Sequence, residues 1–435
     1  MASQQRYRIT GMSRVGVIVF FAVGYLMTGC DDLIGSKQDA TTEEIFEAGR
    51  REPGLINEVE YVPLFPFFSN GADGAPLDQP KDVYVGYDEL IYIVDNRGLH
   101  VLDRAGRGSA FYDIPGGGTS VVQDRRLHVY VTAKRDTFLN GRNWNLPVVL
   151  HYDQLVGSTA VLADIIWHPF DEDSRKFSKP DPIDTDEEVS FTGVGVLYNN
   201  HIFVSRRGPV NVRSSVILPH NAVLEFTPEG RNLQAIPSLH PTRESLRSAL
   251  YPTDITTFVH PPQRSFFSQT RHFIVTQSPV SDDVIGGGLP PIAPLRFSTL
   301  SIRAVLTTDG IVYQSDPEKL QVAANPDRGD GFLYDEFKFS NPTDVTVATD
   351  ETNYLFVLDA GKDSLFVFTA SGIEGVAPPP GSRSTKPVVV SFGGSGDGAS
   401  EFNRPLGVAY FDQIVYVADT GNNRISRFRL NTDFE

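Results

Sequence analysis

Three stretches of the sequence, far apart along the chain, repeat one pattern. They are Ala72–Val85, Gly329–Val347 and Gly396–Tyr410, and each holds Asp-Gly, a gap, an apolar residue, a proline and a valine-centred strand. A fourth start, Tyr251–Phe258, keeps the Pro-x-Asp-Ile centre of the pattern. Self-similarity of this kind indicates one supersecondary unit copied along the chain, so repeats have to be counted before domains.

Each repeat continues with further segments of strand character. Six second strands are expected at Leu90–Asp95, Leu127–Thr132, His201–Arg206, His272–Gln277, Tyr354–Asp359 and Ile414–Asp419. Six third strands follow them, and five weaker fourth strands are expected at Ser109–Ile114, Ala160–Trp167, Leu233–Pro237, Ile311–Asp316 and Lys386–Phe392. Their alternation and their β-branched and aromatic residues favour strand over helix.

The sixth unit lacks a fourth strand, because the chain ends at Glu435 soon after its third strand, Ile425–Leu430. An unused strand, Glu58–Phe65, is available at the other end of the repeat region. A closed ring leaves few exposed sheet edges. The sequence therefore predicts an all-β, six-bladed β-propeller that an N-terminal outer strand closes. Segments rich in Pro, Gly and charge are expected as inserted loops, at Asp171–Glu188, Pro209–His220, His240–Tyr251, Pro279–Pro294, Pro317–Asp335 and Pro378–Pro387.

The last repeat, Gly393–Phe428, resembles an NHL repeat. The resemblance rests on the Gly-Asp-Gly linker, Phe402, Pro405, Gly407-Val408 and the run Val-Ala-Asp-Thr-Gly-Asn-Asn-Arg that ends at Arg424. It implies a six-bladed propeller, and it marks Asp419, Asn422, Asn423 and Arg424 as hallmark residues. We interpret these as structural: the carboxylate at a strand end accepts turn amides, and the guanidinium bonds carbonyls or carboxylates between blades.

The first 29 residues are typical of a targeting segment. Three arginines precede an apolar run, Val15–Thr28, which is shorter than the roughly 20 residues that a membrane-spanning helix needs. The run ends in Met27-Thr28-Gly29-Cys30, which resembles the lipobox of bacterial lipoproteins. The resemblance implies cleavage after Gly29, lipidation of Cys30 and attachment to a membrane of the bacterial cell envelope. We expect a signal peptide at 1–29, a lipidated tether at 30–56 and the propeller at 57–435; an ordinary secretory signal or an uncleaved anchor are the alternatives.

Charge and missing motifs exclude several classes of function. The formal net charge is −16, which repels phosphate backbones, so nucleic acid is not an expected partner. Cys30 is the only cysteine, which leaves no thiolate zinc site and no redox pair. The sequence contains no HExxH motif and no GxSxG nucleophile elbow. We therefore assign no catalytic residue.

Three aspartates occupy equivalent places at the start of innermost strands. Asp82, Asp254 and Asp344 would lie around the channel of a propeller, where they could converge on a cation such as Ca²⁺. The alternative is that each caps its own turn, and Gly407 takes the same place in the sixth repeat. The acidic stretch Phe170–Glu188 is interpreted as a solvated insertion rather than a cation site.

These features favour a lipid-anchored module that binds or scaffolds a protein, peptide or glycan partner. Exposed loop aromatics such as Trp144 are candidates for sugar or peptide binding. The main alternative is a channel-metal-dependent lyase or lactonase of the six-bladed propeller type, and a purely structural subunit of an envelope complex is a third hypothesis. The step from fold to function rests on analogy with NHL-type propellers.

Overall fold

A computed structural model describes residues 59–434, apart from residues 154, 156–160, 171–181, 212–218, 238–250, 263–269, 279–296, 317–318, 320–330, 336 and 383. Val59–Glu435 forms one compact unit, which is separate from Met1–Glu58. The expected signal peptide, Cys30 and the tether lie outside the described residues. Within the residues that the structure does describe, no helix is long and apolar enough to cross a membrane.

The unit consists of six four-stranded antiparallel sheets, as the repeats predict. The sheets, from the innermost strand outward, are β2 (Asp82–Val85), β3 (Ile91–Val94), β4 (Gly98–Leu102) and β5 (Gly108–Asp113); β6 (Gly118–Gln123), β7 (Val129–Leu139), β8 (Arg142–Asp153) and β9 (Val161–Trp167); β10 (Ser190–Val196), β11 (Ile202–Arg207), β12 (Ala222–Phe226) and β13 (Asn232–Ile236); β14 (Pro252–Thr257), β15 (Phe273–Gln277), β16 (Thr299–Thr307) and β17 (Gly310–Ser315); β18 (Pro342–Val347), β19 (Leu355–Asp359), β20 (Ser364–Phe368) and β21 (Phe392–Gly393); and β22 (Gly407–Phe411), β23 (Ile414–Asp419), β24 (Arg424–Leu430) and β1 (Tyr61–Pro63). We number the blades 1 to 6 in this order.

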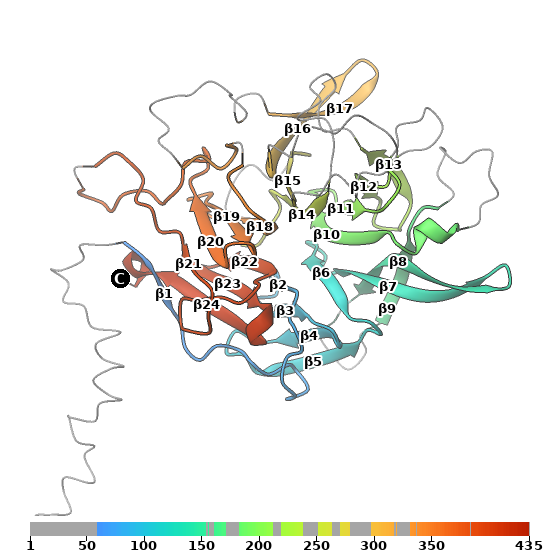
Figure 1. Ribbon diagram of the computed structural model, residues 1–435, viewed down its shortest axis with the longest axis horizontal. Coiled ribbons are helices and arrows are strands. Elements are labelled where there is room, and N and C mark those ends of the chain that lie inside the picture. Colours follow the sequence, from blue (N-terminus) through green and yellow to red (C-terminus); the bar gives the residue numbers. More distant parts are fainter. Residues whose placement is uncertain are drawn as a thin grey trace, which may run out of the picture. The chain divides into compact units, whose positions relative to one another are not determined.

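The innermost strands form a closed ring (Figure 1). Contacts run from β2 to β6, β10, β14, β18 and β22, and from β22 back to β2. The N-terminal strand β1 completes blade 6 by pairing with β24, so that Tyr61 lies opposite Leu430 and Pro63 lies opposite Phe428. The predicted six-bladed propeller with N-terminal closure is confirmed.

The core lies between neighbouring blades. In β3 all four residues, Ile91–Val94, are buried, because other blades cover both faces of the sheet. This explains why second strands such as β3 and β19 are apolar almost throughout instead of alternating with polar residues. Large buried clusters join blades 1, 2 and 3, blades 3, 4 and 5, blades 5 and 6, and blades 6 and 1.

Blade 5 departs from the expected pattern. Its predicted outer strand, Lys386–Phe392, is reduced to the two residues of β21. The segment after β20 turns back and takes the place beside it: Phe368 bridges Glu374, and Gly375 donates its amide to the carbonyl of Val367. Val388 pairs with Val376 and so lies on the outer side of this segment, away from β20.

The up-and-down order of the strands gives the ring two different faces. Every innermost strand begins, and every second strand ends, on the face that also carries the links between blades, which we call the linker face. Five connections at this face, 168–189, 208–221, 237–251, 278–298 and 316–341, belong to blades 2 to 5. Turns on the opposite face are mostly short, as at 86–90, 124–128, 197–201 and 227–231; the longer connections there are 258–272 and 369–391.

Candidate functional site at the channel mouth

Six equivalent positions surround the channel where the innermost strands begin. The strand registers identify them as Asp82, Ser120, Gly193, Asp254, Asp344 and Gly407. The three aspartates predicted from the repeats therefore do share one place in the fold. All three are buried, with less than a tenth of each residue exposed.

Each of these carboxylates joins its blade to the next one. Asp82 accepts the amide of Val121 in blade 2 through Oδ2, at 2.8 Å. Asp254 Oδ2 accepts the amide of Val345 in blade 5, at 3.3 Å. Asp344 Oδ2 accepts the amide of Val408 in blade 6, at 2.5 Å. The same hydrogen bond thus recurs at three blade interfaces, and each time it gives a buried backbone amide an acceptor in the preceding blade.

A second set of bonds between blades comes from threonines that precede two of these aspartates. Thr253 and Thr343 occupy bulges at the starts of β14 and β18. Their hydroxyls donate to the carbonyls of Pro342 and Pro405 in the following blades, at 2.8 and 3.0 Å. The repeated sequence Pro-Thr-Asp at 252–254 and 342–344 was the signal for this pair of contacts.

The three carboxylates are close enough to affect one another's protonation. Burial raises the pKa of Asp254 to about 6, and the charge of Asp82 adds to the rise, although a hydrogen bond with Asp344 opposes it. Burial also raises the pKa of Asp344 well above its usual value, with the neighbouring Asp254 as the next cause. For Asp82 the causes of a raised pKa are burial and then the charge of Asp344. These carboxyl groups therefore hold protons at a higher pH than ordinary aspartates do.

Their oxygens are already engaged. Asp82 and Asp344 each use the second oxygen to accept the amide of the following residue, Val83 or Val345. Among the described residues, no group of three or more His, Cys, Asp or Glu side chains is placed to hold a metal ion. Ca²⁺ at Asp82, Asp254 and Asp344 thus stays a prediction.

The channel is spanned near the opposite face by an aromatic contact. Tyr84 of blade 1 and His260, which follows β14 in blade 4, place their ring centroids 5.8 Å apart. Blades 1 and 4 are opposite each other in the ring, so the contact crosses the channel. His260 is held by a 2.8 Å hydrogen bond to Thr256, and burial lowers its pKa to about 4, which keeps the imidazole neutral at pH 7.

The hallmark residues of the last repeat hold the linker before β22. Asp419 is fully buried; its Oδ1 accepts the amide of Asn403, and its Oδ2 accepts from Asn422 and Arg424. The guanidinium of Arg424 also donates to the carbonyls of Asp397, Gly398 and Glu401, which all belong to this linker rather than to a facing blade. Asn423 has the left-handed φ of 52°, and its side chain accepts the amide of Gln79 in blade 1.

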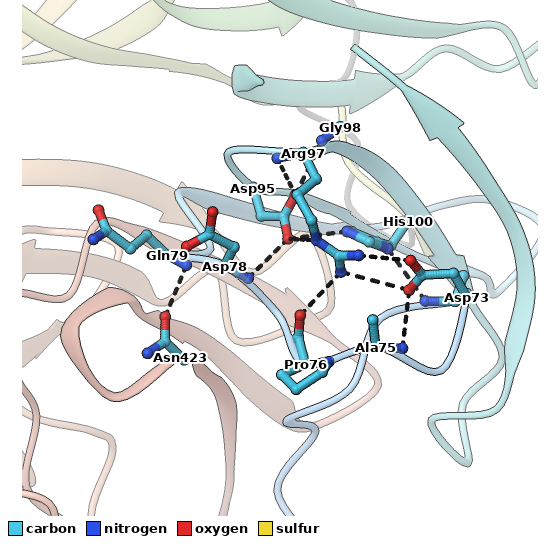
Figure 2. A network of polar contacts seen from close by, with 11 residues as sticks. Asp73, Ala75, Pro76, Asp78, Gln79, Asp95, Arg97, Gly98, His100 and Asn423 are labelled. Carbon is cyan, nitrogen blue, oxygen red and sulfur yellow. Dashed lines mark hydrogen bonds and ion pairs between the residues drawn. The ribbon is translucent and has the colours of Figure 1, made fainter. Parts of the chain in front are cut away.

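Asp95 plays the same part in blade 1 (Figure 2). One carboxylate oxygen accepts the amides of Arg97 and Gly98, and the other accepts the amide of Asp78 and lies 3.0 Å from His100 Nε2. Burial by itself would raise the pKa of Asp95, but hydrogen bonds from His100 and these amides lower it to about 2. Asp359 holds the amides of Ser340 and Asn341 in blade 5 in the same way.

The β7–β8 hairpin extends from blade 2 as an arm on the linker face, and it is the part of the site that the sequence did not predict. Arg142 packs over the indole of Trp144 at 3.9 Å and forms ion pairs with Asp184 and Glu187. Trp144 is consequently only 8% exposed, so its interpretation as an exposed binding aromatic was wrong. The exposed aromatic on this arm is Phe138 instead, at 68%.

Comparison with known proteins agrees with this architecture. Residues 402–428 match the family model of the NHL repeat. The chain is a six-bladed β-propeller with an NHL repeat in its last blade. No curated protein matches it.

The propeller is similar to several solved structures. One is an auxiliary nutrient binding protein from Bacteroides thetaiotaomicron (10% identity, 84% of this chain and 70% of that one, TM-score 0.44). Another is virginiamycin B lyase from Staphylococcus aureus (10%, 86% and 99%, 0.39), and a third is a putative gluconolactonase (11%, 86% and 93%, 0.42). Identities this low say nothing about what this chain binds.

The raised pKa of Asp254 leads to a prediction for stability against pH. The pKa of about 6 lies above the unfolded value of about 3.9. A group shifted upward adds stability that is fully present below the unfolded pKa and is lost as the pH rises through the folded pKa. Asp254→Asn, which keeps an acceptor oxygen, should therefore gain stability relative to the unchanged chain between pH 4 and pH 7, by about 3 kcal/mol at most. Urea unfolding at several pH values measures this.

The exposed Asp309 in the β16–β17 turn supplies the matched control. Asp309→Asn should follow the unchanged chain at every pH. Parallel curves for Asp254→Asn and the unchanged chain would contradict a raised pKa at the channel mouth.

Proposed function

We propose that this propeller is a lipid-anchored protein of the bacterial cell envelope that binds a protein, peptide or glycan partner through its linker face. The observation that carries the proposal is the difference between the two faces: most long connections, and the arm, start from the linker face. Loops positioned by a rigid scaffold are where binding residues concentrate. The hydrogen bonds between blades at the channel mouth supply that rigidity.

The linker face also carries exposed apolar side chains. Phe138 at the end of the arm, Ile183 beside it in the β9–β10 connection and Phe337 in the β17–β18 connection are 68%, 51% and 59% exposed. A few anchor residues, often aromatic, carry most of the energy of protein interfaces. We therefore expect the partner to contact blades 2 to 4.

A photo-crosslinking amino acid placed at Phe138 tests the proposal in cells that make the protein. The expected result is a discrete crosslinked adduct. Excess protein without the crosslinking amino acid should compete for the partner and suppress this adduct. The matched control is the same amino acid at Leu306, which is 81% exposed on the opposite face and should give none. Equal labelling at both positions, or none at Phe138, would contradict a binding role for the linker face.

The lipid anchor is tested separately. Metabolic labelling with a radioactive fatty acid should label the unchanged chain, and Cys30→Ser should remain unlabelled and become soluble. An equally labelled Cys30→Ser protein would exclude Cys30 as the acceptor.

The alternative, a channel-metal-dependent lyase or lactonase, is motivated by one feature, the equivalent positions of Asp82, Asp254 and Asp344 around the channel mouth. It requires a divalent ion there, so calorimetric titration with Ca²⁺ decides it. Binding that Asp344→Asn abolishes would support the enzyme hypothesis; no heat of binding would leave it without a basis.

A further inference from the structure

Two histidines of blade 2 face each other on the side of the ring opposite the linker face. His128 directly precedes β7, and His151 lies in β8, diagonally across from it in the register that pairs Val129 with Tyr152. Nδ1 of His128 and Nε2 of His151 are 2.9 Å apart and share a hydrogen bond. Neither residue takes part in the channel mouth or in the linker face.

The remaining nitrogen of His128 is oriented by a carboxylate. Its Nε2 lies 3.4 Å from Oδ1 of Asp153. A carboxylate at this nitrogen favours the tautomer that carries the proton on Nε2, and it leaves a lone pair on Nδ1, toward His151. Histidines that bind metals almost always have such a partner on the other nitrogen, because it fixes the ring and strengthens the ligand.

The ring of His151 is held as well. It stacks on Tyr130, with centroids 4.7 Å apart and an interplanar angle of 16°. His151 is buried, whereas 20% of the His128 side chain is exposed, so an ion has a path from solvent.

The distance between the two nitrogens, which a hydrogen bond spans in the metal-free protein, also fits one metal geometry. Two ligands about 2.05 Å from one ion lie about 2.9 Å apart when they are at right angles, and about 3.3 Å apart in a tetrahedron. Right angles between imidazole ligands are typical of tetragonal Cu²⁺ or Ni²⁺, and Cu²⁺ is the tighter of the two for a given nitrogen site.

The local charge also favours a cation. The ionisable groups around the pair are Asp124 and Arg126 from the turn before β7, Tyr130 in β7, Asp153 in β8 and Asp164 in β9. Arg126 is paired with Asp124 at 2.9 Å, which leaves two carboxylates without a compensating guanidinium in this set.

We propose that His128 and His151 form a two-histidine site for a bivalent transition metal, with Cu²⁺ as the preferred ion and water completing the coordination. A site with only two protein ligands is compatible with the absence of larger ligand groups among the described residues. It differs in place, in ligand type and in metal from the cation predicted at the channel mouth.

The test uses the full chain, purified without a histidine tag and titrated with Cu²⁺. We expect one equivalent to bind, with an axial electron paramagnetic resonance spectrum that shows coupling to two nitrogens. His128→Gln and His151→Gln should each lower the affinity at least tenfold and remove the two-nitrogen coupling. His272→Gln is the matched control and should leave both unchanged, because His272 belongs to blade 4.

Circular dichroism establishes that each variant is folded before it is titrated. If either histidine variant unfolds, Asp153→Asn replaces it; this should keep both ligands and lower the affinity by about tenfold or more, the effect expected for an orienting partner. Copper binding that both histidine variants retain, or no binding by the unchanged chain, would overturn the proposal.

Discussion

Tyr61→Ala should lower the free energy of unfolding by about 3 to 5 kcal/mol, the range for removing a large aromatic side chain from a core. The closing strand β1 has only three residues, and of these only Tyr61 is buried. Its ring lies 6.2 Å from that of Phe356 and 6.0 Å from that of Phe392, both in blade 5. One side chain therefore joins the N-terminal strand to the neighbouring blade, and without it the edge of β24 is poorly covered.

Urea unfolding followed by circular dichroism measures the loss. Phe65→Ala is the matched control: Phe65 lies two residues beyond β1 and is 65% exposed, so its removal should change stability by less than about 0.5 kcal/mol. If Tyr61→Ala costs less than about 1 kcal/mol, β1 does not contribute to closing the ring in the way we infer.

The closing strand could be predicted from the sequence, because the sixth repeat lacks an outer strand and one strand, Glu58–Phe65, belongs to no repeat. Its register with β24 could not be predicted, since it depends on how Tyr61 fits against blade 5. The predicted outer strand of blade 5, Lys386–Phe392, was too long, because another segment lies beside most of β20. Lys386–Phe392 has strand character, but the residues up to Val376 lie nearer in sequence to β20 and occupy its edge first.

The candidate site could likewise be predicted only in part. The equivalence of Asp82, Asp254 and Asp344 could be predicted, because each follows the same turn and precedes the same strand. What each carboxylate binds could not, since the acceptor amides belong to the next blade. The sequence suggested two roles for the aspartates, local turn caps or metal ligands. Neither includes the hydrogen bonds by which they join one blade to the next.

Histidine contacts show the limit of motif searches. His128 and His151 match no short metal-binding motif, and the pattern of scattered histidines suggested no site. They meet because β7 and β8 pair with Val129 opposite Tyr152. The only sequence signal is that each histidine lies within a predicted strand of the same blade, which becomes informative once the register is known.

Asp95→Ala should cost at least about 3 kcal/mol, because it leaves several buried donors without an acceptor, at about 1 to 3 kcal/mol each. The side chain is fully buried and accepts three backbone amides as well as contacting His100. Asp95→Asn keeps one acceptor oxygen and should lose less. Asp73→Ala, which removes a partly exposed ion pair with Arg97 from the same network, should cost no more than about 1 kcal/mol.

The contribution of Asp95 should also depend on pH. Its pKa of about 2 in the folded protein lies below the unfolded value, so the stabilisation by Asp95 is present above about pH 4 and is lost as the pH falls toward 2. Urea unfolding of the three variants at pH 7 and pH 3 measures both effects; equal losses for Asp73→Ala and Asp95→Ala would show that the buried amides find other partners.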